Sequence, residues 1–184
     1  MPGRQLPHLA SVSNLIVVSE SSRSLRTMSE GSGAVTMALV DLRRGTANKY
    51  SWRPPFDSTI AYENERWWDH APYFAEDPWY VQVLEAGVEV ARVELDDLGG
   101  INPEYTDVPA LGPERLEIQF IEVATAARGR GVGTRVMRGL EQRHANRRLF
   151  AYSEEADGFW TSLGWDRFDH PDGSHRALYI RTAR

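Results

Sequence analysis

A run of closely spaced glycines and arginines is the segment of this sequence best suited to chemistry. It reads Ala-Arg-Gly-Arg-Gly-Val-Gly-Thr over residues 127–134. Glycines allow the backbone to approach a ligand closely, and the N–H groups at the start of a helix attract anions. Because an amphipathic helix is expected to follow, the segment predicts a site for phosphate oxygens.

Two common phosphate-binding patterns match residues 127–134 poorly. A Walker A loop requires a lysine directly before its Ser/Thr, but Gly133 precedes Thr134. A dinucleotide fingerprint requires a third glycine where Thr134 stands, although Glu154 lies at a suitable distance for the ribose-binding acid. The dinucleotide interpretation stays open, but the upstream sequence predicts a strand hairpin rather than a second βαβ unit.

Two carboxylates, Glu117 and Glu122, lie on an apolar strand expected over 116–124. They are five positions apart, so the two-residue alternation of a strand predicts opposite faces of the sheet. We therefore expect one of them to face a cleft, where a carboxylate can take a proton from an amine. For each, the alternative is a charge at a half-exposed position with no chemical role.

Apolar periodicity and turn residues predict the elements that position these groups. Residues 57–75 are expected to form an irregular helix, Ala86-Gly87 a hairpin turn, and 97–115 a loop. Helices are expected over 131–145 and 156–163. Strands are expected over 35–42, 79–85, 88–95, 116–124, 148–153 and 177–181.

Composition restricts the class of protein. The 184 residues carry a formal charge of −5, 41% hydrophobic residues and no cysteine. These values suit one soluble globular domain and exclude disulfide scaffolds, thiolate metal sites and cysteine nucleophiles. Apolar runs are far shorter than the roughly 18 residues that a membrane helix requires, and we expect a cytoplasmic location. Residues 1–34 are Ser-rich, which predicts a disordered tail or a mis-assigned start ahead of one domain over 35–184.

Two motifs together resemble the GNAT N-acetyltransferase superfamily. Arg128-x-x-Gly131-x-Gly133 is similar to that family's acyl-CoA pyrophosphate loop. Residues 153–165, Ser-Glu-Glu-Ala-Asp-Gly-Phe-Trp-Thr-Ser-Leu-Gly-Trp, are similar to its Asn-x-x-Ala-x-x-Phe-Tyr-x-x-Leu-Gly-Phe segment. The resemblance implies an α/β (α+β) fold with a mixed central sheet of about six to seven strands. This sheet would be splayed open at the acyl-CoA site and flanked by helices.

The resemblance also implies roles for single residues. Backbone groups of Val123 and Ala124 would pair with the pantetheine amides, and N–H groups near Val123 would stabilise the oxyanion. Glu117 matches the position of the family's general base, and Glu122 is the second candidate. A Cβ at Gly131 or Gly133 would push the phosphate away. The backbone that would hold the pyrophosphate of acetyl-CoA belongs to Arg128, Gly129, Arg130, Gly131, Val132, Gly133 and Thr134.

The sequence departs from the family pattern at two positions. Trp160 stands where many members have a tyrosine that protonates the leaving sulfur, and an indole N–H cannot serve as that acid. Ser153 replaces the usual asparagine. Trp160 is expected to line the cofactor site, while Tyr152, Ser153 or solvent could supply the proton. The expected activity is acetyl transfer to a primary amine of a small molecule, peptide or protein, and the alternative is a non-catalytic acyl-CoA sensor or regulatory module.

Charged and aromatic residues suggest the partners. Segment 57–122 holds sixteen acidic residues and three arginines, which would attract a cationic amine or form an ordinary solvated surface. Seven arginines within 128–148 are assigned to the phosphate ligand, and nucleic acid is not an expected partner of this acidic chain. An acetyltransferase toxin or RNA-directed enzyme is therefore disfavoured, whereas an exposed final strand could support a homodimer. Six aromatic residues could wall an acceptor pocket or pack the core: Trp67, Trp68, Tyr73, Phe74, Trp79 and Tyr80.

One further segment carries side chains of the kind that bind metals. Residues 169–175 read Asp-His-Pro-Asp-Gly-Ser-His. Because Pro-Asp-Gly is a turn signature, we expect a turn here and no metal.

Overall fold

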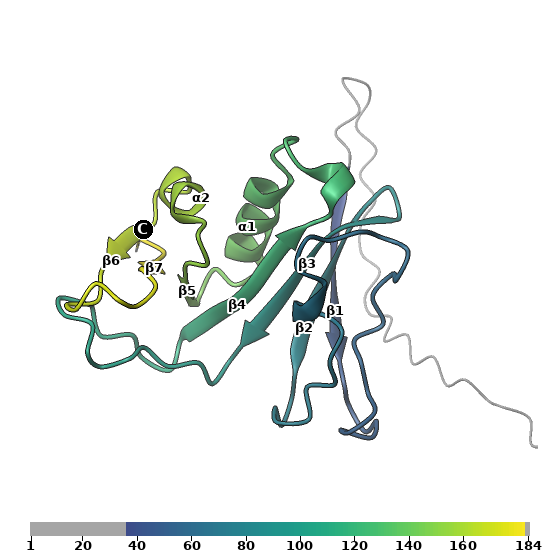
Figure 1. Ribbon diagram of the computed structural model, residues 1–184, viewed down its shortest axis with the longest axis horizontal. Helices are drawn as coiled ribbons and strands as arrows, with labels where there is room; N and C mark the ends of the chain where they lie inside the picture. The colour runs from purple at the N-terminus through teal and green to yellow at the C-terminus, as the bar shows by residue number, and fades with distance from the viewer. Residues whose placement is uncertain (1–35, 183–184) are drawn as a thin grey trace, which may run out of the picture. The chain divides into compact units, whose positions relative to one another are not determined.

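The computed structural model describes residues 36–182 and contains a seven-stranded mixed sheet (Figure 1). The predicted tail, residues 1–34, lies outside the described residues. The strands lie in the order β1-β2-β3-β4-β5-β7-β6. Their bounds are β1 Met37–Arg43, β2 Trp79–Glu85, β3 Val88–Asp96, β4 Arg115–Val123, β5 Arg148–Tyr152, β6 Asp166–Phe168 and β7 Leu178–Ile180. The mixed sheet is confirmed, and β6 is an addition that the sequence did not predict.

The added strand changes one expectation. β7 pairs with β5 on one side and with β6 on the other, both antiparallel. The final strand therefore has no free edge, and the homodimer suggested through it has no strand edge to use. The three residues of β6 were missed because so short a run carries too little periodicity to be recognised.

Two helices cover one face of the sheet, as Figure 1 shows. α1 runs over Val132–Arg143 and α2 over Asp157–Ser162, both within their predicted ranges. Val136, Met137 and Leu140 of α1 are fully buried in one core cluster with residues of β4 and β5. A second, smaller cluster includes Tyr105, Phe150, Leu178 and Ile180. Among residues 36–182 there is no helix with the length and apolar character needed to cross a membrane.

The helix predicted over 57–75 is wrong. The segment forms only a single 3-10 turn, η1 (Glu65–Trp67), and otherwise irregular backbone. Asp57 accepts hydrogen bonds from the backbone and hydroxyl of Thr59, a local contact that competes with helix formation. The backbone N–H groups of Glu63 and Asn64 donate to a buried carboxylate rather than to helical carbonyls. Tertiary contacts thus decide the conformation of this segment.

Strands β2 and β3 form the predicted hairpin. Ala86 and Gly87 connect them, with φ angles of +50° and +81°. Positive φ at both turn residues matches the right-handed twist of the strands that they join.

Strands β4 and β5 part early, which creates an opening within the sheet. They pair in parallel from Arg115 with Arg148 to Glu117 with Phe150. β4 continues to Val123, and within the described residues nothing pairs with it on that side. A short 3-10 turn, η2 (Thr125–Ala127), then leads into α1. The opening therefore lies beside the glycine-rich segment.

A β-bulge at Gln119 changes which side chains share a face. Across from β3, Phe120 pairs with Glu94 but Ile118 pairs with Leu95, so Gln119 is an extra residue on β4. Directly paired residues lie on the same face, and Arg92, Glu94 and Asp96 alternate along one face of β3. Their partners, in the same order, are Glu122, Phe120 and Glu117. The prediction that Glu117 and Glu122 lie on opposite faces is therefore wrong, because the bulge breaks the two-residue alternation.

Candidate functional site

A hollow of about 560 Å³, the α1 hollow, lies where the end of β4, the start of α1 and α2 meet. Residues 63–67 close it on the other face of the sheet. Arg130, Ala124, Glu117 and Ser153 do not line it. The predicted cofactor residues that it brings together are Val123, Arg128, Gly129, Gly131, Val132, Gly133, Thr134 and Trp160.

The glycines of the loop serve two different purposes. Gly129 and Gly131 have φ angles of +72° and +67°, and Gly131 is the N-cap of α1. This conformation favours glycine, and it exposes the first N–H groups of the helix to the α1 hollow. At Gly133, by contrast, a Cβ would lie 3.1 Å from Cε2 of Phe159. Close packing of α1 against α2 is thus an additional reason for glycine at Gly133, and the expected clash with phosphate stays a prediction.

The arginines of the loop are held by a buried acid that the sequence did not point to. Glu85, at the end of β2, is 5% exposed. Arg130 Nη2 donates to its Oε2 at 2.9 Å, and Arg135 forms an ion pair with the same carboxylate. Arg135 also donates to the carbonyl oxygen of Arg130 at 2.7 Å. These contacts hold the loop in place. No local sequence pattern could have linked Glu85 to residues so distant in the sequence.

Glu122 lines the α1 hollow, but its oxygens are already used. One carboxylate oxygen accepts the backbone N–H groups of Glu63 at 2.8 Å and Asn64 at 2.9 Å. The other accepts the indole N–H of Trp68 at 2.8 Å. Arg128 bridges Glu122 and Glu63 by ion pairs. Glu122 therefore fastens the segment that closes the hollow, a role that leaves it poorly suited to proton abstraction.

The backbone of β4 presents Val123 to the opening but not Ala124. The N–H of Ala124 donates to the carbonyl of Val90 at 2.9 Å, and its carbonyl accepts the N–H of Ala127. Successive residues of an antiparallel strand face alternate sides, so Val123 directs its N–H away from β3, toward the β4–β5 opening. Val123 remains a candidate for binding the pantetheine arm. The contacts of Ala124 do not favour its predicted role, because its N–H pairs with Val90 of β3 and its carbonyl accepts a hydrogen bond within η2.

Glu117 lies at the last β4–β5 pair, where the opening begins. The carboxylate is 6% exposed and packs beneath Gly99, where an added Cβ would contact its side chain. Burial, with a smaller contribution from the negative charge of Asp96, raises the pKa of Glu117 to about 7. A carboxylate with this pKa can act as a base near neutral pH. Glu117 is thus separated from the α1 hollow and sits beside a second one.

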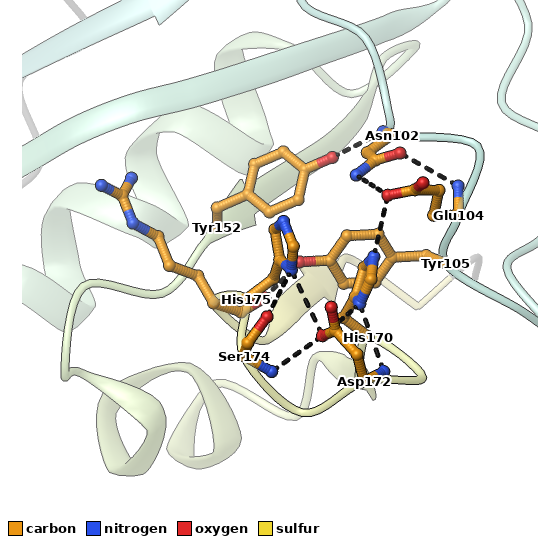
Figure 2. A network of polar contacts seen from close by, with 9 residues as sticks. Asn102, Glu104, Tyr105, Tyr152, His170, Asp172, Ser174 and His175 are labelled. Carbon is orange, nitrogen blue, oxygen red and sulfur yellow. Dashed lines mark hydrogen bonds and ion pairs between the residues drawn. The ribbon is translucent and has the colours of Figure 1, made fainter.

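The second hollow, the Tyr152 hollow, has a volume of about 640 Å³ and lies between loop 97–114 and the turn before β7. Figure 2 shows Tyr152, at the end of β5, with its hydroxyl directed at Asn102. That hydroxyl accepts the backbone N–H of Asn102 at 2.9 Å, and burial raises the pKa of Tyr152. An ion pair between Arg176 and Glu154 joins the linings of the two hollows.

Neither residue that departs from the family pattern is placed to give a proton to sulfur. Ser153 is 4% exposed, and its hydroxyl oxygen accepts the N–H of Ala156 at 3.2 Å, ahead of α2. Trp160 lines the α1 hollow with one edge and packs against Trp165, with ring centroids 5.0 Å apart. The predicted catalytic role of Ser153 is therefore not supported by its position.

The aromatic residues singled out by the sequence lie in three different places: the core, the α1 hollow and the surface. Trp67 stacks on Phe120 with ring centroids 4.6 Å apart and is the one member of the predicted set that lines the α1 hollow. Tyr80 and Trp68 are buried, whereas Tyr73 and Phe74 are exposed.

Comparisons with known proteins give the family. A model of the acetyltransferase (GNAT) family matches residues 44–165. No curated protein matches the sequence. Three solved structures are similar at low identity. An acetyltransferase from Thermus thermophilus shares 16% identity over 56% of this chain and 63% of its own, with a TM-score of 0.42. The chain thus spans less than two thirds of that relative.

The other two structures have similarly low sequence identity. The AHL synthase LasI shares 17% identity over 80% of this chain and 90% of its own, with a TM-score of 0.49. The Bacillus subtilis N-acetyltransferase YlbP, solved in complex with coenzyme A, shares 16% over 56% and 67%, with a TM-score of 0.43. The family match includes the glycine loop and α2 and spans more than half of the sequence. The chain therefore belongs to the acetyltransferase (GNAT) family.

Proposed function

We propose that the protein is an acetyl-CoA-dependent N-acetyltransferase that transfers the acetyl group directly to a primary amine of a small molecule, peptide or protein. The observation that carries the proposal is the placement of Glu117. A buried carboxylate with a pKa of about 7 stands where β4 and β5 part, and β4 continues from there to the loop that begins α1, whose N-terminus is suited to phosphate. A cytoplasmic location, where acetyl-CoA is available, goes with this proposal.

The α1 hollow fits acetyl-CoA in three respects. The first N–H groups of α1 would bind the pyrophosphate, and the N–H of Val123 would bind the pantetheine arm. Ile121, Phe159 and Trp160 supply apolar walls. When bound, acetyl-CoA supplies an activated acetyl group as a thioester. No metal ion is required for this transfer.

The residues of the chain then have distinct tasks. Glu117 takes a proton from the acceptor nitrogen, through a water in the β4–β5 opening, as that nitrogen bonds to the carbonyl carbon and the carbon–sulfur bond breaks. Another backbone N–H of β4 near Val123, distinct from the one that binds the pantetheine arm, donates to the carbonyl oxygen as negative charge develops there. The thiolate takes its proton from solvent, which a thiol pKa near 8.5 permits without a dedicated acid.

Calorimetric titration with acetyl-CoA tests the cofactor site. We expect binding by the native chain and its loss in Gly131→Glu, which places a carboxylate beside the phosphates. Gly45→Glu is the matched control, since Gly45 also has a positive φ, +56°, and open space around it. Absence of binding by the native chain would refute the proposal.

Turnover is tested by release of free CoA across a panel of amines that includes polyamines, aminoglycosides and peptides. We expect release with at least one amine. Tight binding of acetyl-CoA with no release across the panel would support the alternative, a sensor or regulatory module. The positions of Trp160 and Ser153 are the observations that favour that alternative.

A further inference from the structure

Two histidines and a glutamate from distant parts of the chain meet beside the Tyr152 hollow. Glu104 comes from loop 97–114, and His170 and His175 come from the turn before β7 (Figure 2). One potential ligand atom from each lies within 4.8 Å of the others. We propose that these three side chains form a binding site for a divalent transition-metal ion, with Zn²⁺ as the best match to two imidazoles and a carboxylate.

The contacts of His170 leave room for a cation. Its Nδ1 lies 2.6 Å from Oδ1 of Asp172, and its Nε2 lies 3.2 Å from Oε2 of Glu104. Ionised carboxylates only accept hydrogen bonds, while a neutral imidazole carries one N–H and one acceptor nitrogen. For a neutral ring, one of these two contacts therefore joins a ring nitrogen that carries no proton to a carboxylate oxygen, and both of these atoms are hydrogen-bond acceptors. A metal ion between Nε2 and Glu104 satisfies both atoms, and a second proton on the ring is the competing solution.

Asp172 orients His170 in the way common at zinc sites. Its Oδ1 accepts the backbone N–H of Ser174 at 2.8 Å, which holds the carboxylate in place against Nδ1. Metal-binding histidines usually donate their second ring N–H to a carboxylate, which fixes the tautomer and directs the other nitrogen at the metal. Asp172 would thus support the site without being a ligand.

The distances suit a tetrahedral ion. With metal–ligand bonds of about 2.0–2.1 Å, neighbouring ligand atoms lie about 3.3 Å apart. The 3.2 Å between His170 and Glu104 matches this value, and the ligand nitrogen of His175 lies within 4.8 Å of both of these atoms. His170 is 8% exposed, whereas His175 lines the Tyr152 hollow. The remaining coordination position would therefore open toward that hollow.

The predicted turn is present and helps to build the site. Gly173 donates from its backbone to the carbonyl of His170 at 2.9 Å, so the chain reverses between the two histidines. Their rings consequently stack, with centroids 4.0 Å apart. The sequence expectation of no metal considered this segment by itself, and Glu104 could not be assigned to it from spacing.

Titration of the chelator-treated full chain with ZnCl₂ tests the proposal, with MgCl₂ as the comparison ion. We expect saturable zinc binding that Glu104→Gln and His175→Ala each weaken at least about tenfold, and Asp172→Asn weakens about 10–100-fold. Glu104 and His175 are exposed, so these variants should fold. His70→Ala is the matched control and should bind as the native chain does.

Thermal unfolding provides a second readout that does not depend on enzymatic activity. Zinc should raise the melting temperature of the native chain and of His70→Ala, because it links two loops that the unfolded chain does not hold together. The rise should be absent in Glu104→Gln. The proposal is overturned if the native chain binds no zinc, or if Glu104→Gln and His175→Ala bind it as tightly as the native chain does.

Discussion

Burial sets the proton affinity of two carboxylates on one face of the sheet. Desolvation raises the pKa of both Glu94 and Glu117 to about 7, and the charge of Asp96 raises each further in the same direction. Glu94 and Asp96 alternate along β3, and the direct pairing of Asp96 with Glu117 places Glu117 on the same face. Near neutral pH both glutamates are therefore partly ionised, one with a proposed chemical role and one without.

Glu117→Gln should reduce kcat/KM about 10²–10⁴-fold, because glutamine cannot take a proton. In the native enzyme the rate should rise with pH through about 7, as Glu117 loses its proton, and this limb should vanish in the variant. Affinity for acetyl-CoA should be unchanged, since Glu117 does not line the α1 hollow. A pH–rate profile measures the rate and its pH dependence, and a calorimetric titration measures the affinity for acetyl-CoA. A variant with native rates and a native profile would exclude Glu117 as the base.

Glu94→Gln should stabilise the protein at alkaline pH. A carboxyl whose pKa is raised in the folded state adds stability below its ordinary pKa, 4.5, and that stability is lost as pH rises through about 7. At pH 8 the native chain keeps a largely buried charge whose Oε2 has no partner among the described residues. We expect a gain of about 1–3 kcal/mol at pH 8 and little change at pH 4.

Urea unfolding at the two pH values checks this expectation. Glu76→Gln, at an exposed acid, is the control and should show no such difference. If Glu94→Gln lost stability at pH 8, the carboxylate would have to be stabilised by contacts that outweigh its desolvation.

At the scale of elements, the start of α1 depends on the end of β2. Glu85 sits directly before the hairpin turn, and its carboxylate holds Arg130 and Arg135 across the loop. This places the charges of Arg130 and Arg135 against a buried acid rather than in the α1 hollow, whereas Arg128 lines the hollow and is paired with Glu63 and Glu122. We therefore expect backbone N–H groups to provide most of the phosphate binding, consistent with the positive φ of Gly131.

Arg130→Met should therefore lower the free energy of unfolding by about 1 kcal/mol, since it removes one partner of a buried carboxylate. The dissociation constant for acetyl-CoA should change less than about threefold. Arg138→Met, on the exposed side of α1, should change neither the stability nor the affinity. Chemical denaturation and calorimetry separate the two effects. A tenfold loss of affinity at native stability would instead make the Arg130 side chain a phosphate ligand.

The hairpin offers a gain in stability. Ala86 adopts a left-handed conformation, φ +50°, that costs an L-residue with a Cβ roughly 1–2 kcal/mol. Asparagine followed by glycine is the favoured pair for such a two-residue turn. We expect Ala86→Asn to raise the free energy of unfolding by about 0.5–1 kcal/mol, measured by urea denaturation. Ala86→Val should lower it, and equal stability of both variants would contradict the assigned turn.

At the scale of the whole molecule, the sequence predicted what local patterns determine. The hairpin, both helices and the glycine loop follow from turn residues and apolar spacing, and the mixed sheet follows from their resemblance to a known family. Contacts between distant segments decided the rest. The bulge at Gln119, the unwound segment 57–75 and the meeting of Glu104 with His170 each depend on a partner many residues away. No periodicity within a short window can reveal such a partner.

The distribution of charge along the chain is one long-range feature that the sequence shows and the structure explains. Acids dominate residues 57–122 and arginines dominate 128–148. In the folded protein four arginines of the second segment pair with acids of the first: Arg128 with Glu63 and Glu122, Arg130 and Arg135 with Glu85, and Arg147 with Asp97. The basic segment is thereby largely neutralised, which removes the basis for a nucleic-acid surface and weakens the attraction of the acidic segment for a cationic acceptor.

These pairs join segments that the unfolded chain separates, so salt should weaken the native state. Most of the arginines are partly exposed, and each pair contributes about 0–1 kcal/mol that added ions screen. We expect the free energy of unfolding to fall by about 1–2 kcal/mol between roughly 50 and 500 mM NaCl, measured by urea denaturation at about pH 7.5. Arg135→Met should reduce this dependence, whereas Arg138→Met, which removes a charge without an ion pair among the described residues, should not. If salt stabilised the native chain instead, repulsion among its excess acids would outweigh the paired charges, and the two segments would be held together by their apolar contacts.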